Sequence, residues 1–319
     1  MSDEGMSSVV APATFDCRVA FGEELMELAR RDRRVLAVCN DSVASSNLAA
    51  FAKELPDRFV NVGIAEQDMV GVAAGLANAG YIPFVCAGAA FLTGRALEQI
   101  KDDLAYGNWH VVLCGMSPGM SYGELGPTHH SIEDVAWLRA ISNVTVIVPA
   151  DPIQTRASVR WAAGADHPVY LRIGRFKVPR VTPEGAELDI ERAMELRSGD
   201  DLCIMATGTM ISRALEAASR LEGRRYRVRV LALATVKPLA AEALVRAASE
   251  TRRVVTVEEG VVDGGMGSAV AALLSQRCPV PMRILGVPEF APTGNPGFLL
   301  DHFGLNAVGI EAAALELLA

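Results

Sequence analysis

The chain has 319 residues, half of them hydrophobic, and a formal net charge of −8. A chain of this length buries about three quarters of the surface that its unfolded form exposes, and it suggests two domains. The negative charge and the scattered arginines argue against nucleic-acid binding and against an anionic membrane surface. We expect a cytoplasmic protein, because the polar start MSDEGMSS is no secretory signal and no apolar run approaches the roughly 18–20 residues of a membrane span.

Alternating strand and helix patterns fill the first half of the chain, after a loose arm expected over residues 1–14. We expect helices over residues 18–30, 47–55, 65–79, 92–106, 131–141 and 152–163, and strands over 34–39, 59–62, 81–86, 110–114, 144–149 and 168–173. This alternation predicts an α/β domain with an open, mostly parallel sheet over residues 15–180. Residues 115–130 lack periodicity and follow a strand, and a loop of that length is typical of a functional segment.

The second half repeats the pattern in shorter form. Residues 176–190 contain two prolines and little periodicity, so we interpret them as a linker. Four strands and four helices then predict a second open, mostly parallel sheet over residues 190–319. The segment VDGGMGSA (262–269) lacks the G-x-G-x-x-G spacing of a dinucleotide loop. We interpret it as close packing at a helix start, with nucleotide binding as a less favoured alternative.

The six cysteines show no CxxC or other paired spacing. Four of them end or interrupt apolar runs that resemble strands, where cysteine behaves as a small hydrophobic residue. We interpret all six as reduced core residues and predict no metal site in this chain. The cysteines are Cys17, Cys39, Cys86, Cys114, Cys203 and Cys278.

One carboxylate, Glu66, stands at the start of the expected helix in FVNVGIAEQDMVGVAAGLANAG, residues 59–80. The free backbone N–H groups and the dipole of a helix start stabilise negative charge, so this carboxylate is expected to stay ionised and to point at a ligand or partner. Acidic residues are common in first turns, and a plain helix-terminal charge is the alternative.

Four motifs in chain order, NVGIAEQDMVGVAAGLA, AFLTGRALEQIK, GPTHH and VIVPAD, closely resemble the C-terminal half of transketolases. The resemblance is strongest to the separate small subunit of split transketolases, and it covers nearly the whole chain from about residue 15. It implies a pyrimidine-binding domain over 15–180 and a transketolase C-terminal domain over 190–319. The cofactor that it implies is thiamine diphosphate.

The resemblance also implies roles near the cofactor. The family glutamate that matches Glu66 hydrogen-bonds the N1′ nitrogen of the aminopyrimidine and so favours the tautomer that deprotonates the thiazolium ring. Such proton transfer is worth about 10²–10⁴ in rate. Phe91 matches an aromatic residue that stacks on the aminopyrimidine, and Asp41 matches an acid beside the cofactor.

Other matches concern the substrate. His129 matches the substrate-facing histidine of the family motif, whose imidazole can donate to a carbonyl or hydroxyl oxygen near neutral pH. His130 stands where the family often has glutamine. Arg18, Ser46 and Arg175 match residues that bind the phosphate of sugar substrates, a role suited to the charged guanidinium fork.

At three positions the chain departs from the family. Gly88 replaces a second aromatic residue, which suggests a wider pocket, while Met116 replaces a histidine and Leu125 replaces an aspartate. Each lost hydrogen bond to a charged group costs about 1.5–3 kcal/mol. We therefore predict transfer of a two-carbon ketol group from a ketose or ketose phosphate to an aldehyde, with an atypical substrate. Ordinary pentose-phosphate transketolase activity is kept as an alternative.

The Gly-Asp-Gly run that holds diphosphate and a divalent metal in this family does not occur in the sequence. The resemblance therefore implies a large partner subunit that holds the diphosphate and Mg²⁺, in an α2β2 assembly. Small residues of the 65–79 helix, such as Gly71 and Gly75, would allow close helix contact at such an interface or inside the domain. Two further alternatives are the β subunit of a 2-oxoacid decarboxylating enzyme and a non-catalytic stabilising subunit.

Overall fold

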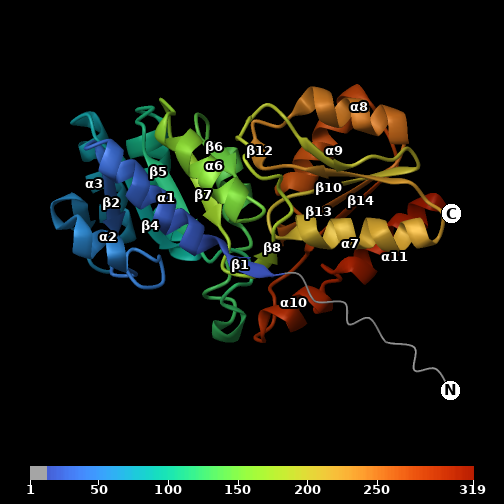
Figure 1. The fold of residues 1–319 in the computed structure, drawn as a ribbon, viewed down its shortest axis with the longest axis horizontal. Coiled ribbons are helices and arrows are strands. Elements are labelled where there is room, and N and C mark those ends of the chain that lie inside the picture. The colour runs from blue at the N-terminus through green and yellow to red at the C-terminus, as the bar shows by residue number, and fades with distance from the viewer. Residues whose placement is uncertain (1–12) are drawn as a thin grey trace, which may run out of the picture.

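The computed structural model describes residues 13–319. The first half contains an open α/β sheet flanked by helices (Figure 1). Its strands are β2 (Val35–Cys39), β3 (Phe59–Asn61), β4 (Ile82–Gly88), β5 (Val112–Met116), β6 (Thr145–Ile147) and β7 (Val169–Ile173). Its helical elements are α1 (Cys17–Arg31), α2 (Ala49–Glu54), η1 (Pro56–Arg58), α3 (Glu66–Asn78), η2 (Phe91–Arg95), α4 (Leu97–Gln99), η3 (Ile100–Ala105), η4 (Gly123–Leu125), α5 (Asp134–Ala140) and α6 (Pro152–Ala163).

The second half lies beside the first (Figure 1). Its strands are β9 (Met194–Arg197), β10 (Leu202–Ala206), β11 (Val228–Ala232), β12 (Thr235–Lys237), β13 (Val254–Val261) and β14 (Met282–Val287). Its helices are α7 (Met210–Gly223), α8 (Ala241–Thr251), α9 (Met266–Arg277), α10 (Pro296–His302) and α11 (Ala307–Leu318). The expected α/β alternation is therefore present in both halves.

Two open sheets result, and the predicted fold class is confirmed. The larger sheet has the order β12-β6-β7-β5-β4-β2-β3, and the smaller has the order β14-β13-β10-β11-β9. The edge strands β12 and β9 run antiparallel to their neighbours, and the other pairs in both sheets are parallel. The central strands β2, β5 and β7 are buried along their whole length, as expected for parallel strands covered by helices on both faces.

Two details of the sheets differ from the sequence prediction. The second sheet has five strands instead of four, because β9 adds an antiparallel edge. Strand β12, which the sequence pattern did not predict, leaves the second half and pairs with β6 of the first sheet. This pairing satisfies backbone groups at the edge of the first sheet and ties the two halves together.

A short ribbon forms next to the first sheet. Strand β1 (Thr14–Asp16) pairs antiparallel with β8 (Lys177–Pro179), inside the segment expected to be a linker. The arm expected over residues 1–14 lies, up to residue 12, outside the described residues. Helix α1 begins directly after β1, with the Asp16 side chain accepting a hydrogen bond from the Arg18 N–H at 2.9 Å.

The helix expected over residues 92–106 is present but irregular. Both η2 and η3 are π-helical turns, with the short α4 between them. Such turns are frequent at functional sites. At Gly94, the ring of Trp137 packs so closely that an added Cβ would lie 3.1 Å from it. This packing fixes the turn that contains Phe91 and Arg95.

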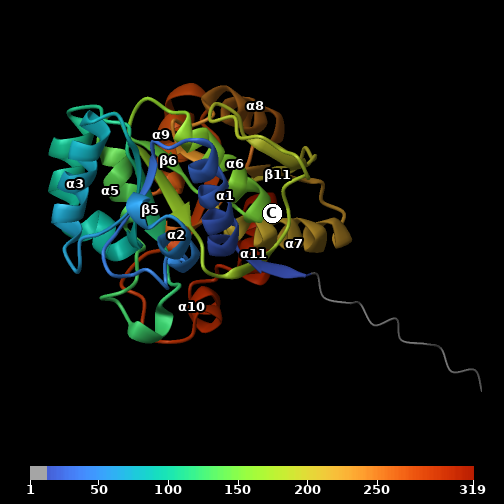
Figure 2. The ribbon, with the colours of Figure 1, turned by 60° about the vertical axis from the view of Figure 1, so that its left-hand side comes forward.

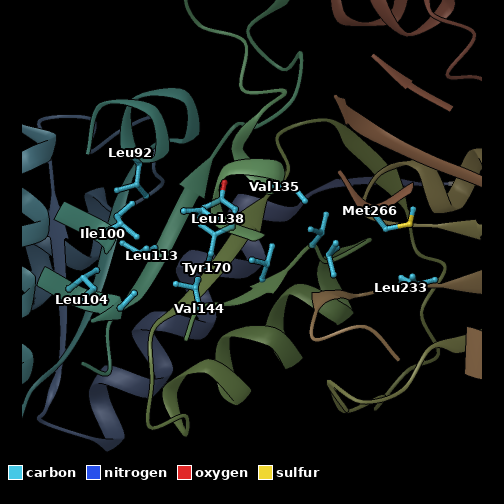
Figure 3. Close-up of a cluster of buried hydrophobic side chains, with 14 of the residues drawn as sticks. Leu92, Ile100, Leu104, Leu113, Val135, Leu138, Val144, Tyr170, Leu233 and Met266 are labelled. Carbon is cyan, nitrogen blue, oxygen red and sulfur yellow. The ribbon is translucent and has the colours of Figure 1, made fainter. Parts of the chain in front are cut away.

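A continuous hydrophobic core joins the two halves (Figure 3). It includes Leu92 and Leu113 from the first half, Leu138 of α5, and Leu233 and Met266 from the second half. Separate clusters lie between the first sheet and α1 and α6, and between the second sheet and α7 and α11. The first sheet is therefore held rigidly against the second domain.

Residues Pro296–Leu318 have the length and composition of a membrane-spanning helix, contrary to the expectation that no segment would. They fold as two separate helices, α10 and α11, with Gly304 at φ 65° between them. Helix α11 packs against α7, β13 and β14. The segment therefore contributes to the core of the second domain.

Candidate active site

The candidate residues gather where the parallel strands of the first sheet end. Asn40 and Asp41 follow β2, Glu66 begins α3 after β3, and Phe91 follows β4. Arg175 follows β7. Because the carboxyl ends of parallel strands meet at one edge, these side chains share that edge, where open α/β sheets bind ligands.

Glu66 is the most buried of these residues, with an exposed fraction of 1%. Asn40 Nδ2 donates to its Oε1 at 2.7 Å, and Arg95 Nη1 donates to its Oε2 at 2.5 Å. Burial opposes ionisation, but the hydrogen bonds from Arg95, from the helix backbone and from Asn40 outweigh it and lower the pKa of Glu66. The lowered pKa favours the ionised carboxylate, which points into the protein and pairs with Arg95.

A row of contacts leads from Glu66 toward the long loop after β5. The guanidinium of Arg95 lies over the Phe91 ring, 5.0 Å from its centroid. The Phe91 ring meets the His129 ring edge-on, with the centroids 5.3 Å apart. Two of the residues expected to contact cofactor and substrate, Phe91 and His129, therefore touch each other.

The row continues through Tyr122, whose ring centroid lies 6.3 Å from that of His129. The guanidinium of Arg175 lies 5.0 Å from the Tyr122 centroid. His130 is buried next to this row, with its Nε2 3.4 Å from the Gly123 carbonyl oxygen. Its burial lowers the pKa of the imidazole, which favours the neutral form of His130.

Arg18 and Ser46 form a second group. Arg18 donates to the Ser45 carbonyl oxygen at 3.1 Å and pairs with Asp16 at 2.6 Å. The Ser46 side chain is fully buried, and its hydroxyl oxygen has no partner atom among residues 13–319. In the β1–β8 ribbon Asp16 is opposite Lys177. Arg18 comes two residues after Asp16, and Arg175 comes two residues before Lys177. The two arginines therefore lie at the same end of this ribbon.

Asp41 and the three departures from the family have distinct environments. Asp41 is exposed and has a positive φ of 71°, which aspartate tolerates better than most residues. A Cβ on Gly88 would lie 3.2 Å from the Phe91 ring, so the expected wider space is filled by that ring. Met116 is 1% exposed and packs in the core near α1, whereas Leu125 is 56% exposed.

The sequence analysis did not predict three residues of the candidate site: Arg95, Asn40 and Tyr122. Arg95 occurs in the motif AFLTGR four residues after Phe91, so its place in the motif was an available signal. Asn40 directly precedes Asp41, and Tyr122 lies in the long loop. None of the three has a spacing that, by itself, indicates contact with Glu66 or His129.

The cysteines and the 262–269 loop lie apart from the contact row. Within residues 13–319 no group of three or more His, Cys, Asp or Glu could hold a metal ion. The six cysteines are free thiols, five of them buried. At the 262–269 loop, the N–H groups of Met266 and Gly267 donate to Glu258 at 2.8 and 2.7 Å. The protein's own carboxylate thus occupies the amides that a nucleotide phosphate would use.

The fold is that of an α/β protein with a candidate ligand site at the carboxyl edge of its first sheet. Residues 13–180 match the family described as "Transketolase, pyrimidine binding domain", and residues 191–310 match "Transketolase, C-terminal domain". The chain belongs to the transketolase family. This confirms the resemblance drawn from the four sequence motifs.

The relatives that match this chain along nearly their whole length include subunits of split enzymes. The chain is 44% identical to the B subunit of the apulose-4-phosphate transketolase of Phocaeicola vulgatus, over 94% of this chain and 96% of the relative. It is 40% identical to the 6-deoxy-6-sulfo-D-fructose transketolase subunit SqwH of a Clostridium species, over 94% and 93%. A 1-deoxy-D-xylulose-5-phosphate synthase of Desulfotalea psychrophila is 35% identical, but only 48% of its length is matched. In extent, the chain therefore corresponds to the small subunit of a split transketolase.

Solved structures of transketolases have the same fold as this chain. A structure titled "Split gene transketolase, inactive beta4 tetramer" has a TM-score of 0.88 and 39% identity, covering 97% of this chain and 99% of that chain. The transketolase of Leishmania mexicana has a TM-score of 0.81 at 23% identity, and this chain covers 46% of it. The latter likeness shows the fold alone.

Proposed function

We propose that this chain is the small subunit of a cytoplasmic, thiamine-diphosphate-dependent transketolase that is active only with a large partner subunit. The reaction is transfer of a two-carbon ketol group from a ketose, or ketose phosphate, to an aldehyde. The observation that carries the proposal is the row of contacts from Glu66 through Arg95, Phe91 and His129 at the carboxyl edge of the first sheet.

The groups around Glu66 fit an aminopyrimidine, which offers N–H donors and a flat ring. Glu66 supplies an ionised carboxylate, and the Oδ1 atom of the neighbouring Asn40 is buried without a hydrogen-bond partner among the described residues. An unpaired buried acceptor is costly, and a ligand donor would relieve that cost. The Phe91 ring is only partly buried and supplies a surface for stacking.

Thiamine diphosphate supplies the nucleophilic carbon that accepts the two-carbon unit. The residues of this chain would position it and handle protons. Glu66 would hold a proton at the pyrimidine nitrogen, Phe91 would stack on the ring, and Asp41 would lie beside the cofactor. His129 would donate a hydrogen bond to a substrate oxygen.

Substrate binding is proposed for the outer residues of the site. Arg175 and Arg18 would contact an anionic group, since both lie at the same end of the β1–β8 ribbon. The Ser46 hydroxyl in the loop after β2 is buried and has no hydrogen-bond partner within the described part of the chain. Burial lowers the pKa of His130 and favours its neutral form, and its Nε2 lies 3.4 Å from the Gly123 carbonyl oxygen in the loop that also contains His129.

A large partner subunit is proposed to hold the diphosphate and Mg²⁺ in an α2β2 assembly. Exposed apolar side chains support a protein interface: Ile64, two residues before Glu66, is 79% exposed, and Tyr106, directly after η3, is 90% exposed. A hollow beside Tyr106 is lined by Ala74 and Gly75 from the second half of α3. A Cβ on Gly75 would meet nothing within 4 Å, which leaves room for close approach of another chain.

The substrate is proposed to differ from an ordinary pentose phosphate. By their names, the two similar bacterial subunits belong to enzymes acting on apulose-4-phosphate and on 6-deoxy-6-sulfo-D-fructose, which supports an atypical sugar. Met116 and Leu125 stand where the family has polar residues. An apolar side chain at these positions offers no hydrogen bond to a sugar hydroxyl.

The test is to purify the chain together with a candidate large subunit and to assay the complex. We expect ketol transfer from a ketose phosphate to an aldehyde that depends on thiamine diphosphate. Glu66→Ala should lower turnover by about 10²–10⁴. Asp68→Ala, which removes an exposed acid from the same first turn of α3, should have little effect. Release of CO2 from pyruvate without ketol transfer, or unchanged turnover of Glu66→Ala, would contradict the proposal.

A further inference from the structure

The loop that contains Tyr122 and His129 is held mainly from the second half of the chain. The Met120 N–H donates to Glu259 Oε1 at 2.7 Å. The Gly294 N–H donates to the Gly123 carbonyl oxygen at 3.1 Å, and the Val261 N–H donates to the Ile132 carbonyl oxygen at 2.9 Å. These three bonds come from residues more than a hundred positions away in sequence.

Glu259 is the one side chain among these three contacts. It is 4% exposed, and its second oxygen, Oε2, accepts from Thr209 Oγ1 at 3.0 Å. The carboxylate reaches into the turn at Gly119, where φ is 63° and a Cβ would collide with it. The turn therefore wraps closely around the Glu259 carboxylate.

The returning part of the loop is fixed at the same place. Ser131 and Gly119 exchange two backbone hydrogen bonds, of 2.9 and 2.8 Å. Arg172 Nη2 donates both to the Ser131 carbonyl oxygen at 3.0 Å and to the Glu259 carbonyl oxygen at 2.8 Å. The base of the loop is thus bonded directly to the Glu259 side chain and, through Arg172, to the Glu259 carbonyl oxygen.

The tip of the loop rests on the second half as well. In both views the loop lies beside α10 (Figures 1 and 2), and η4 packs against that helix. A Cβ on Gly126 would lie 2.7 Å from Thr293 Oγ1, and one on Gly123 would lie 2.7 Å from Leu299 Cδ1. The segment between base and tip includes Tyr122 of the contact row.

We propose that Glu259 is a positioning residue, which holds the 117–131 loop in the conformation that places Tyr122 and His129 against Phe91 and Arg175. The second domain then shapes the substrate end of the site although none of its side chains belongs to the contact row. The role of His129 in this inference rests on the proposed function, whereas the conformation of the loop does not.

The neighbouring residue Glu258 provides a matched control. It is 2% exposed and also accepts two backbone N–H groups, but these belong to Met266 and Gly267 at the start of α9. Loss of either carboxylate leaves buried donors unpaired and weakens the second domain. Only loss of the Glu259 carboxylate releases the loop.

Hydrogen exchange of the full-length chain, followed by mass spectrometry, tests the loop directly. In Glu259→Ala we expect amides of residues 119–131 to exchange about tenfold faster or more, since a buried donor loses its acceptor. In Glu258→Ala the faster exchange should be confined to the second domain. Glu259→Gln should restore the protection, because its amide oxygen can accept from Met120. Unchanged exchange of 119–131 in Glu259→Ala, or equal acceleration in Glu258→Ala, would overturn the inference.

Thr209→Val keeps the test decisive if Glu259→Ala does not fold. This near-isosteric change removes the donor to Glu259 Oε2, and it should accelerate exchange in the 119–131 segment only. Unchanged exchange in that segment would count against the inference.

In the complex with the large subunit, Glu259→Ala should raise the KM for the ketose donor. The thiamine diphosphate concentration that gives half-maximal activity should stay unchanged, because Glu66 lies outside the loop. A donor KM equal to that of the wild type would contradict the positioning role. An inactive wild-type complex would count against the proposed function, while the exchange experiment would still decide the role of Glu259.

Discussion

Replacing Arg95 by leucine should raise the pKa of Glu66 and lower the free energy of unfolding of the chain. Glu66 keeps its bond from Asn40 but loses the 2.5 Å ion pair with Arg95. A hydrogen bond to a buried charge is worth about 1.5–3 kcal/mol, but the Arg95 side chain is 47% exposed and solvent weakens the pair. The contact of Arg95 with the Phe91 ring adds about 0.5 kcal/mol. We therefore expect a loss of about 1.5 kcal/mol at pH 7.

The free energy of unfolding lost in Arg95→Leu should decrease as the pH falls. Folding lowers the pKa of Glu66, so its contribution is present above the unfolded-state pKa of about 4.3 and disappears as the pH falls through the lower folded-state value. The difference between wild type and Arg95→Leu should be full at pH 7 and should shrink at pH 4 and below. Urea unfolding followed by circular dichroism at several pH values measures this difference.

Two controls separate the ion pair from general effects. Arg34→Leu removes the exposed partner of the half-buried Asp32, and it should change the free energy of unfolding by less than about 0.5 kcal/mol. In a Glu66→Gln background, Arg95→Leu should cost markedly less, because the charge it pairs with is gone. Equal costs in both backgrounds, or a loss that is the same at pH 7 and pH 4, would refute the reasoning.

Three other changes test the core and the proposed substrate pocket. Asp134→Ala removes the partner of the buried Arg172 (2.8 Å) and of the Tyr170 hydroxyl (2.6 Å), and should cost about 3–5 kcal/mol in urea unfolding; a loss under about 1 kcal/mol would contradict this. Gly115→Ala places a Cβ against the Tyr170 hydroxyl and should lower stability by about 1–3 kcal/mol, seen as a lower Tm; an unchanged Tm would show that the ring moves freely. Leu125→Asp, at an exposed position, should lower the KM for a pentose phosphate about 2–10-fold in the complex, and an unchanged KM would remove Leu125 from the substrate pocket.

Much of the architecture followed from local sequence patterns. Buried five-residue strands such as β2 and β5 show as apolar runs and amphipathic helices such as α1 show a helical period, and both patterns depend on nearby residues alone. The strands β9 and β12 were missed because their pairing partners lie far away in the chain. The irregular turns η2 and η3 were predicted as one helix, since the same apolar residues suit an α-helix and a π-helical turn.

The sequence by itself determined the alternation of strands and helices, the family, and the motif residues Glu66, Phe91 and His129. Tertiary structure alone decided which groups these residues meet. Arg95 reaches Glu66 from another element, and Glu259 reaches Met120 across 139 positions of sequence. A buried carboxylate takes whichever donors packing brings within about 3 Å, and sequence periodicity does not record that distance.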